Sequence, residues 1–79
     1  MPTVTMFSTV WCGYCRRLKN QMSEAGIPFQ EIDLDEVPGK YDDMIIERTG
    51  GYRTVPTLEI HGKLYVNPTI KEVKAAVFA

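Results

Sequence analysis

The hydrophobic and polar positions along this chain change period several times, and these changes divide it into short strands and helices. Residues 3–7 and 29–34 are short apolar runs of the kind that forms strands, with one face of the first run built from Val4 and Met6. Between the two runs, residues 13–25 carry an apolar stripe at helical spacing, and a helix between two strands is the crossover that parallel strands require. The stripe consists of Cys15, Leu18, Met22 and Ala25.

The second half of the chain has the pattern of a helix followed by a hairpin. Residues 41–48 place apolar side chains at helical spacing and stop at Gly50-Gly51, which predicts a helix and its end. Residues 57–60 and 63–66 alternate as strands do. The His61-Gly62 pair between them predicts a tight turn, because glycine tolerates a positive φ.

The last helix has two alternative starts in the sequence. Thr69 and Glu72 have the spacing of a capping box, in which the threonine is the N-cap. Asn67 could instead be the N-cap, with Pro68 at the first helical position. Either start completes the order βαβ–ββα. We therefore expect a single α/β domain over residues 1–79, with one four-stranded mixed sheet and three helices.

Composition and charge narrow the classes of function. Nine basic and ten acidic side chains leave a net charge of −1, which gives no general attraction for nucleic acid or acidic lipid. The apolar runs are too short to cross a bilayer, so we expect no membrane partner. No secretion signal precedes the first strand, so we expect a cytoplasmic protein.

The candidate chemistry lies in the only two cysteines of the sequence, Cys12 and Cys15. A Cys-x-x-Cys pair between a strand and a helix indicates thiol–disulfide exchange. The first cysteine lies at the helix N-terminus, which favours a thiolate, so Cys12 is the expected nucleophile and Cys15 the residue that can close a disulfide. Structural zinc generally needs four ligands, and His61 is the one further strong candidate. Arg16 rather than histidine follows the pair, which argues against haem attachment.

These motifs resemble the glutaredoxin family of the thioredoxin fold. The resemblance rests on the Trp11–Cys15 segment, on Thr54-Val55-Pro56-Thr57 and on the βαβ–ββα order, and it covers essentially the whole chain. It implies that the bond before Pro56 is cis and that the proline lies against the cysteines. It also implies that the Val55 backbone pairs with the bound thiol or peptide.

One segment departs from the pattern of glutathione-binding members. They usually carry a glycine pair and acidic residues after the last strand, whereas residues 66–70 here contain neither. Together with the Asn67-Pro68 pair, this segment is similar to the mycoredoxin group, which reduces mixed disulfides of mycothiol. The resemblance implies no bound cofactor and a low-molecular-weight thiol as the reductant, with mycothiol first, then bacillithiol, and glutathione a poor third.

Several neighbours of the cysteines are candidate substrate-binding residues. Tyr14 lies between the cysteines, so we expect it to be exposed and to contact the bound thiol. Trp11 either shields the disulfide or packs against the core, and packing is the slightly favoured interpretation. Arg53 is an even choice between a role in the ligand groove and a solvated side chain. Thr54 and Asn67 offer hydrogen-bonding groups to a ligand rich in hydroxyls.

The expected partners are a small thiol and its mixed disulfides with proteins, and the chain is expected to be a monomer. A rival interpretation is a thioredoxin-like redoxin that a flavin-dependent thioredoxin reductase reduces, for example to supply ribonucleotide reductase. A rival from another class is an iron–sulfur cluster carrier, in which Cys12 would hold iron.

Overall fold

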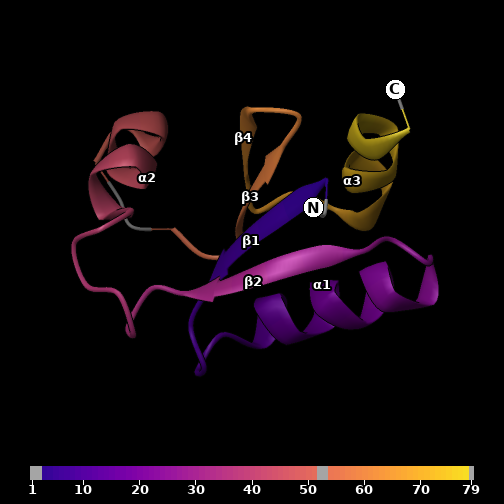
Figure 1. The fold of residues 1–79 in the computed structure, drawn as a ribbon, viewed down its shortest axis with the longest axis horizontal. Coiled ribbons are helices and arrows are strands. Elements are labelled where there is room, and N and C mark those ends of the chain that lie inside the picture. Colours follow the sequence, from indigo (N-terminus) through magenta and orange to yellow (C-terminus); the bar gives the residue numbers. More distant parts are fainter. Residues whose placement is uncertain (1–2, 52–53, 79) are drawn as a thin grey trace.

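The structure is a computed structural model that describes residues 3–51 and 54–78. Three helices occur in these residues: α1 spans Gly13–Glu24, α2 spans Asp42–Thr49 and α3 spans Ile70–Val77. With the four strands between them they follow the order βαβ–αββα (Figure 1). The helix after the second strand is therefore present as the apolar spacing predicted, and the βαβ and ββα halves are both confirmed.

The strands form one mixed sheet in the order β2-β1-β3-β4. The central strand β1 (Val4–Ser8) is parallel to β2 (Phe29–Asp33). It is antiparallel to β3 (Thr57–Ile60), which forms a hairpin with β4 (Lys63–Val66). The fold class expected from the sequence is thus confirmed, and the connection from β1 through α1 to β2 is the predicted parallel crossover.

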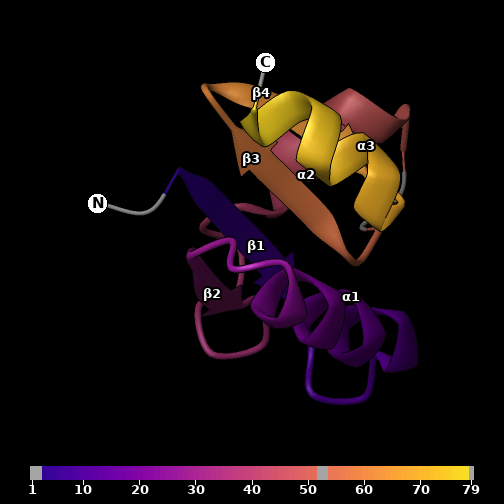
Figure 2. The ribbon, with the colours of Figure 1, turned by 90° about the vertical axis from the view of Figure 1, so that its right-hand side faces the viewer.

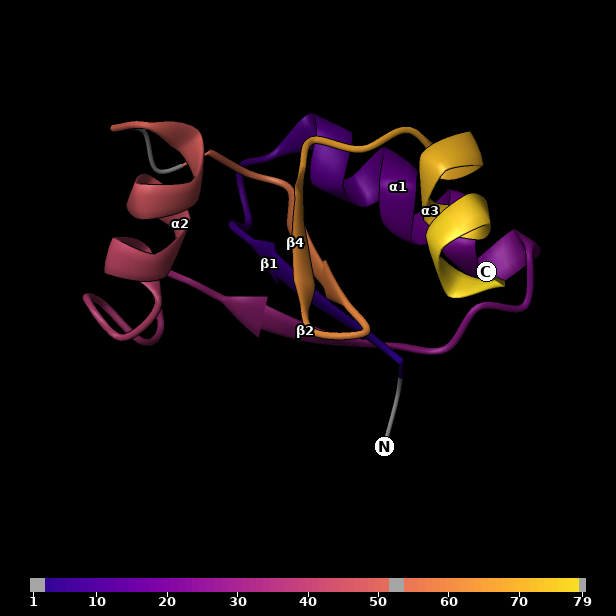
Figure 3. The same ribbon diagram turned by 90° about the horizontal axis from the view of Figure 1, so that it is seen from above.

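Helices cover both faces of the sheet. Helices α1 and α3 lie on one face and α2 lies on the other (Figure 3), and Figure 2 looks onto the face that α1 and α3 cover. Two apolar clusters fill the layers. The cluster under α2 is built from Phe7, Leu34 and Ile45. The larger cluster, under α1 and α3, contains Val4, Met6, Cys12, Cys15, Leu18, Met22, Ile27, Leu58, Ile60 and Val73.

Local sequence signals set the ends of the elements. Gly26 follows α1 with φ +71° and Gly50 ends α2 with φ +84°, a region that glycine enters without steric cost. His61 and Gly62 both have positive φ in the β3–β4 turn, as predicted. Helix α3 begins with Thr69 as its N-cap. The alternative start at Asn67 and Pro68 is therefore wrong, because Thr69 supplies the capping hydroxyl two residues later.

Two strands differ from the sequence prediction by one residue at their ends. The first strand runs from Val4 to Ser8 rather than over residues 3–7. The second ends at Asp33, but the N–H of the buried Leu34 still donates to the Ser8 carbonyl at 2.9 Å. In the described part of the chain, every helix is too short or too polar to cross a membrane.

Candidate active site

The cysteine pair lies where the chain leaves β1 and enters α1. Cys12 has an extended backbone (φ −85°, ψ 107°) and is the N-cap of α1, and its N–H donates to the Thr9 carbonyl at 3.2 Å. Its Sγ accepts a hydrogen bond from the backbone N–H of Cys15 at 3.1 Å. The two cysteines are joined by a disulfide with a Cα–Cα distance of 5.3 Å. Both side chains are buried, so only a narrow part of the pair is accessible.

This geometry suits the chemistry of a redox-active thiol. The Cys15 N–H in the first turn of α1 already points at the Cys12 sulfur, and a helix N-terminus favours a thiolate there once the disulfide is reduced. The thiolate is the nucleophile in disulfide exchange. Cys15 lies one turn further along the same helix, which places it within reach of a disulfide formed on Cys12.

Large apolar side chains around the pair are exposed. Val10, Trp11 and Tyr14 have exposed fractions of 75%, 68% and 69%. Tyr14 is exposed, as expected, and its contact with a bound thiol stays a prediction. For Trp11 the favoured interpretation, packing against the core, is wrong, because the loop before Cys12 carries its ring away from both apolar clusters. No sequence pattern marks which face of so short a loop turns outward.

The segment before β3 approaches the start of α1. The Val55–Pro56 bond is cis, as predicted, and Pro56 is buried. The Pro56 carbonyl accepts a hydrogen bond from the Asn67 N–H at 2.8 Å, and the buried Thr57 hydroxyl donates to the Thr54 carbonyl at 2.6 Å. The first bond holds the proline loop against the end of β4, and the second closes the loop on itself. The candidate residue Arg53 lies outside the described residues.

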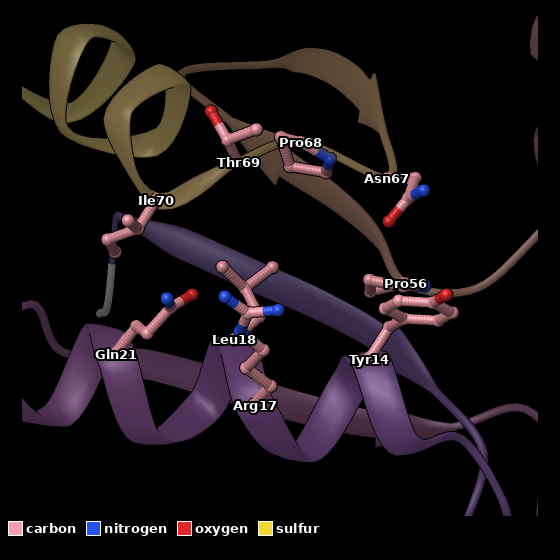
Figure 4. A pocket seen from close by; sticks show the side chains of 9 residues that line it. All are labelled: Tyr14, Arg17, Leu18, Gln21, Pro56, Asn67, Pro68, Thr69 and Ile70. Carbon is pink, nitrogen blue, oxygen red and sulfur yellow. The ribbon is translucent and has the colours of Figure 1, made fainter.

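A groove of about 350 Å³ starts beside this segment and runs along α1 (Figure 4). One wall is the helix face made by Tyr14, Arg17, Leu18 and Gln21. The opposite wall is Pro56 together with the chain that enters α3, which contributes Asn67, Pro68, Thr69 and Ile70. Figure 4 shows the Tyr14 ring beside Pro56. Since Tyr14 lies between the two cysteines in the sequence, this is the end of the groove nearer the cysteine pair.

The groove contains three of the eight described residues that the sequence marked as catalytic or substrate-binding. Tyr14, Pro56 and Asn67 line it, whereas Trp11, Thr54 and Val55 do not, and the cysteines themselves lie in the core cluster. Val55 packs against both apolar clusters, so its backbone rather than its side chain is left for a ligand.

Sequence analysis missed the polar side chains in the middle of the groove. Arg17 and Gln21 follow Tyr14 at positions i+3 and i+7, so all three lie on one face of α1. That spacing was available in the sequence, but only the position of α3 shows that this face is a groove rather than a solvated surface. Thr69 was recognised as a cap and not as part of the groove wall.

A polar cluster lies on the other side of α1. The Glu31 carboxylate accepts a hydrogen bond from the Ser8 hydroxyl at 2.7 Å and forms a salt bridge with Lys19 at 2.9 Å. Burial alone would raise the pKa of Glu31, but the Ser8 hydrogen bond and the Lys19 charge outweigh it and hold the pKa below its usual value. Within residues 3–51 and 54–78, no group of three or more His, Cys, Asp or Glu side chains could hold a metal ion.

The fold and this site define a class of protein. A Cys-x-x-Cys disulfide at the N-terminus of a helix, just beyond the carboxyl end of a central strand, with a cis-proline opposite the first turn of that helix, is the arrangement of a thiol–disulfide oxidoreductase with the thioredoxin fold.

Comparison with known proteins agrees with this class. The glutaredoxin family model matches residues 4–65. A Mycobacterium tuberculosis (strain H37Rv) protein provisionally named a glutaredoxin is 37% identical over 73 residues, which cover 91% of this chain and 86% of that protein. Mycoredoxin 1 of Corynebacterium glutamicum is 32% identical over 80 residues and covers 100% and 98% of the two chains. The crystal structure of a glutaredoxin from Archaeoglobus fulgidus is similar in fold, with a TM-score of 0.74, 22% identity and coverage of 100% and 89%.

The chain therefore belongs to the glutaredoxin family. It is a glutaredoxin-type thiol–disulfide oxidoreductase with a Cys12–Cys15 pair, and members of this family act on mixed disulfides between proteins and low-molecular-weight thiols.

Proposed function

We propose that this protein reduces mixed disulfides between proteins and a hydroxyl-rich small thiol, with mycothiol as the preferred reductant. The observation that carries the proposal is that the hydrogen-bond donors of Thr69, in the groove wall at the start of α3, are already bonded within the protein. There the Glu72 carboxylate accepts hydrogen bonds from both the N–H and the hydroxyl of Thr69, at 3.1 Å each. The Glu72 carboxylate would repel a ligand carboxylate and compete with it for the N–H and the hydroxyl of Thr69.

That repulsion bears directly on the choice of thiol. The γ-glutamyl end of glutathione carries a free carboxylate and an ammonium group. A helix N-terminus suits the carboxylate and an acidic side chain suits the ammonium, but none of the residues that line the groove is acidic. At this helix the Glu72 carboxylate already satisfies Thr69. The rest of the wall offers the Asn67 amide and Pro68, which has no N–H to donate. A neutral ligand whose hydroxyls donate and accept suits this wall better.

The proposed reaction consists of two exchanges. The Cys12 thiolate attacks the small-thiol sulfur of the mixed disulfide, and the protein sulfur leaves as a thiolate with the electron pair of the broken bond. Cys12 then carries the small thiol. A second small-thiol molecule, as its thiolate, attacks the small-thiol sulfur of this adduct, which gives a symmetric small-thiol disulfide and frees the Cys12 thiolate. Alternatively, the Cys15 thiolate attacks Cys12 and expels the small thiol, and an external reductant later reduces the Cys12–Cys15 disulfide.

The remaining residues have positioning roles in this proposal. Tyr14 and Pro56 border the end of the groove beside the cysteines, where they would hold the cysteinyl part of the small thiol. The half-buried Val55 would offer its backbone to the ligand, and Thr54 would hold the proline loop through its carbonyl. Trp11, which lies outside the groove, would contact the protein half of the mixed disulfide. We further propose that residues 1–79 act in the cytoplasm as one monomeric domain.

A coupled assay tests the proposal. One carrier peptide is prepared as mixed disulfides with mycothiol, bacillithiol and glutathione, and each thiol is supplied at the same concentration with its own reductase. We expect the highest kcat/KM with mycothiol and the lowest with glutathione. Equal turnover with glutathione and mycothiol would overturn the choice of thiol. Turnover only with a thioredoxin reductase and NADPH would favour the redoxin alternative, and visible absorbance after anaerobic purification would favour the iron–sulfur alternative.

A further inference from the structure

A second cavity continues the groove beyond Gln21 and Ile70. Its volume is about 280 Å³, and these two residues line both cavities. The remaining lining residues are Glu24, Ala25 and Lys74. In Figure 4, Gln21 and Ile70 lie at the end of the first groove away from Tyr14 and Pro56. The two cavities therefore form one long channel between α1 and α3, with the cysteine pair at one end.

The length of this channel restricts what can fill it. Gln21 and Glu24 lie nine and twelve residues after Cys12 along α1, which is roughly 14 Å and 18 Å along the helix axis at 1.5 Å per residue. In a tripeptide with cysteine in the middle, either end lies within about two residue lengths of the sulfur, roughly 7 Å when extended. Such a thiol, attached to Cys12, ends before the second cavity.

The side chains of the second cavity favour a carbohydrate-like occupant. Glu24, Gln21 and Lys74 provide a carboxylate, an amide and an ammonium group, which together accept from and donate to hydroxyl groups. Ala25 and Ile70 provide apolar surface for the carbon faces of a ring. In the described part of the chain, neither Glu24 nor Lys74 takes part in a salt bridge, so both charges are available to a ligand.

We propose that this second cavity, between Glu24 and Lys74, binds the ring end of an elongated, polyhydroxylated thiol whose cysteine is attached to Cys12. The proposal rests on the proposed function, because it requires a small thiol with cysteine at one end and sugar-like rings at the other. The channel then selects its reductant by length as well as by charge: the cysteinyl end lies beside Tyr14 and Pro56, and the rings lie beyond Gln21.

The test compares two mixed disulfides of one carrier peptide, one with mycothiol and one with N-acetylcysteine, which has the cysteinyl end without the rings. The double variant Glu24→Ala/Lys74→Ala should raise KM for the mycothiol substrate about five- to ten-fold, as expected for two lost hydrogen-bonding groups at a partly solvated site. Its kcat should stay the same, and so should KM for the N-acetylcysteine substrate. The variant Lys71→Ala removes an exposed charge from the same helix outside both cavities and should change neither.

Each other outcome overturns the proposal in a distinguishable way. If the wild-type protein turns over the mycothiol substrate and the double variant has an unchanged KM, the second cavity binds no rings although the proposed function stands. If KM rises equally for both substrates, the occupant is the carrier peptide rather than the thiol. If the wild-type protein does not turn over the mycothiol substrate at all, the proposed function fails and the ring site fails with it. Thermal melts of each variant confirm that the exposed substitutions leave the fold intact.

Discussion

Replacing Thr69 by alanine should destabilise the protein by a definite amount, because the residue closes a reciprocal pair of hydrogen bonds at the start of α3. The Thr69 hydroxyl accepts from the Glu72 N–H at 3.2 Å, and Glu72 accepts from the Thr69 N–H at 3.1 Å. The alanine variant loses the first bond and weakens the second, which costs about 1 kcal/mol for an exposed N-cap. In a domain of this size, that loss lowers Tm by roughly 4–8 °C.

Urea and thermal denaturation followed by circular dichroism measure this loss, with every variant kept in the disulfide form so that the redox state is constant. Thr69→Ser retains the capping hydroxyl and should stay close to the wild-type stability. The Thr69→Ala change should also weaken binding of the small thiol, because α3 carries one wall of the groove. A Thr69→Ala variant as stable as the wild type, or a Thr69→Ser variant that loses as much, would refute the capping argument.

Three further outcomes are expected. Tyr14→Ala should raise KM for mixed disulfides of the small thiol with both a protein and a short peptide, with little change in Tm, because the ring is exposed and lines the groove, whereas Trp11→Ala should raise KM only for the protein mixed disulfide; equal effects would contradict the assignment. Glu31→Gln should lower the free energy of unfolding at pH 7 by less than about 1 kcal/mol, since the pair with Lys19 is partly exposed. The folded pKa of Glu31 is lower than its ordinary value of 4.5, so this difference should be present above that value and should disappear as the pH falls below it; a difference that persists in acid would exclude the ion pair as its cause. In Cys15→Ser, alkylation of Cys12 near pH 7 should be faster than in the urea-unfolded variant, because the N-terminus of α1 favours the thiolate; identical rates would contradict the helix-terminus argument.

The order of the elements could be predicted from local sequence, because each signal acts within a few residues. The β3–β4 hairpin follows from two alternating runs around His61 and Gly62, and the observed strands match those runs. The end of α1 follows from Gly26, which has the positive φ that glycine adopts freely. The cysteine pair was placed at a helix N-terminus from the strand before it and the apolar stripe after it.

Features that depend on packing between distant segments could not be predicted in the same way. Arg17 and Gln21 become groove residues only because α3 lies opposite them, and nothing within α1 indicates that neighbour. The position of Pro56 beside Tyr14 brings together two segments that are far apart in the sequence. The exposure of Trp11 depends on the direction of a short loop, for which apolar character was a misleading guide.

The most direct test of the central claim is the mass of the Cys15→Ser variant after incubation with a protein that carries mycothiol in a mixed disulfide. Cys12 should attack the small-thiol sulfur, so the account predicts a gain of one mycothiol on Cys12 and release of the protein as a free thiol. The variant lacks the second thiol of the pair, so this adduct should persist until more mycothiol is added. A covalent complex between Cys12 and the carrier protein, or no adduct with mycothiol when glutathione gives one readily, would contradict the account.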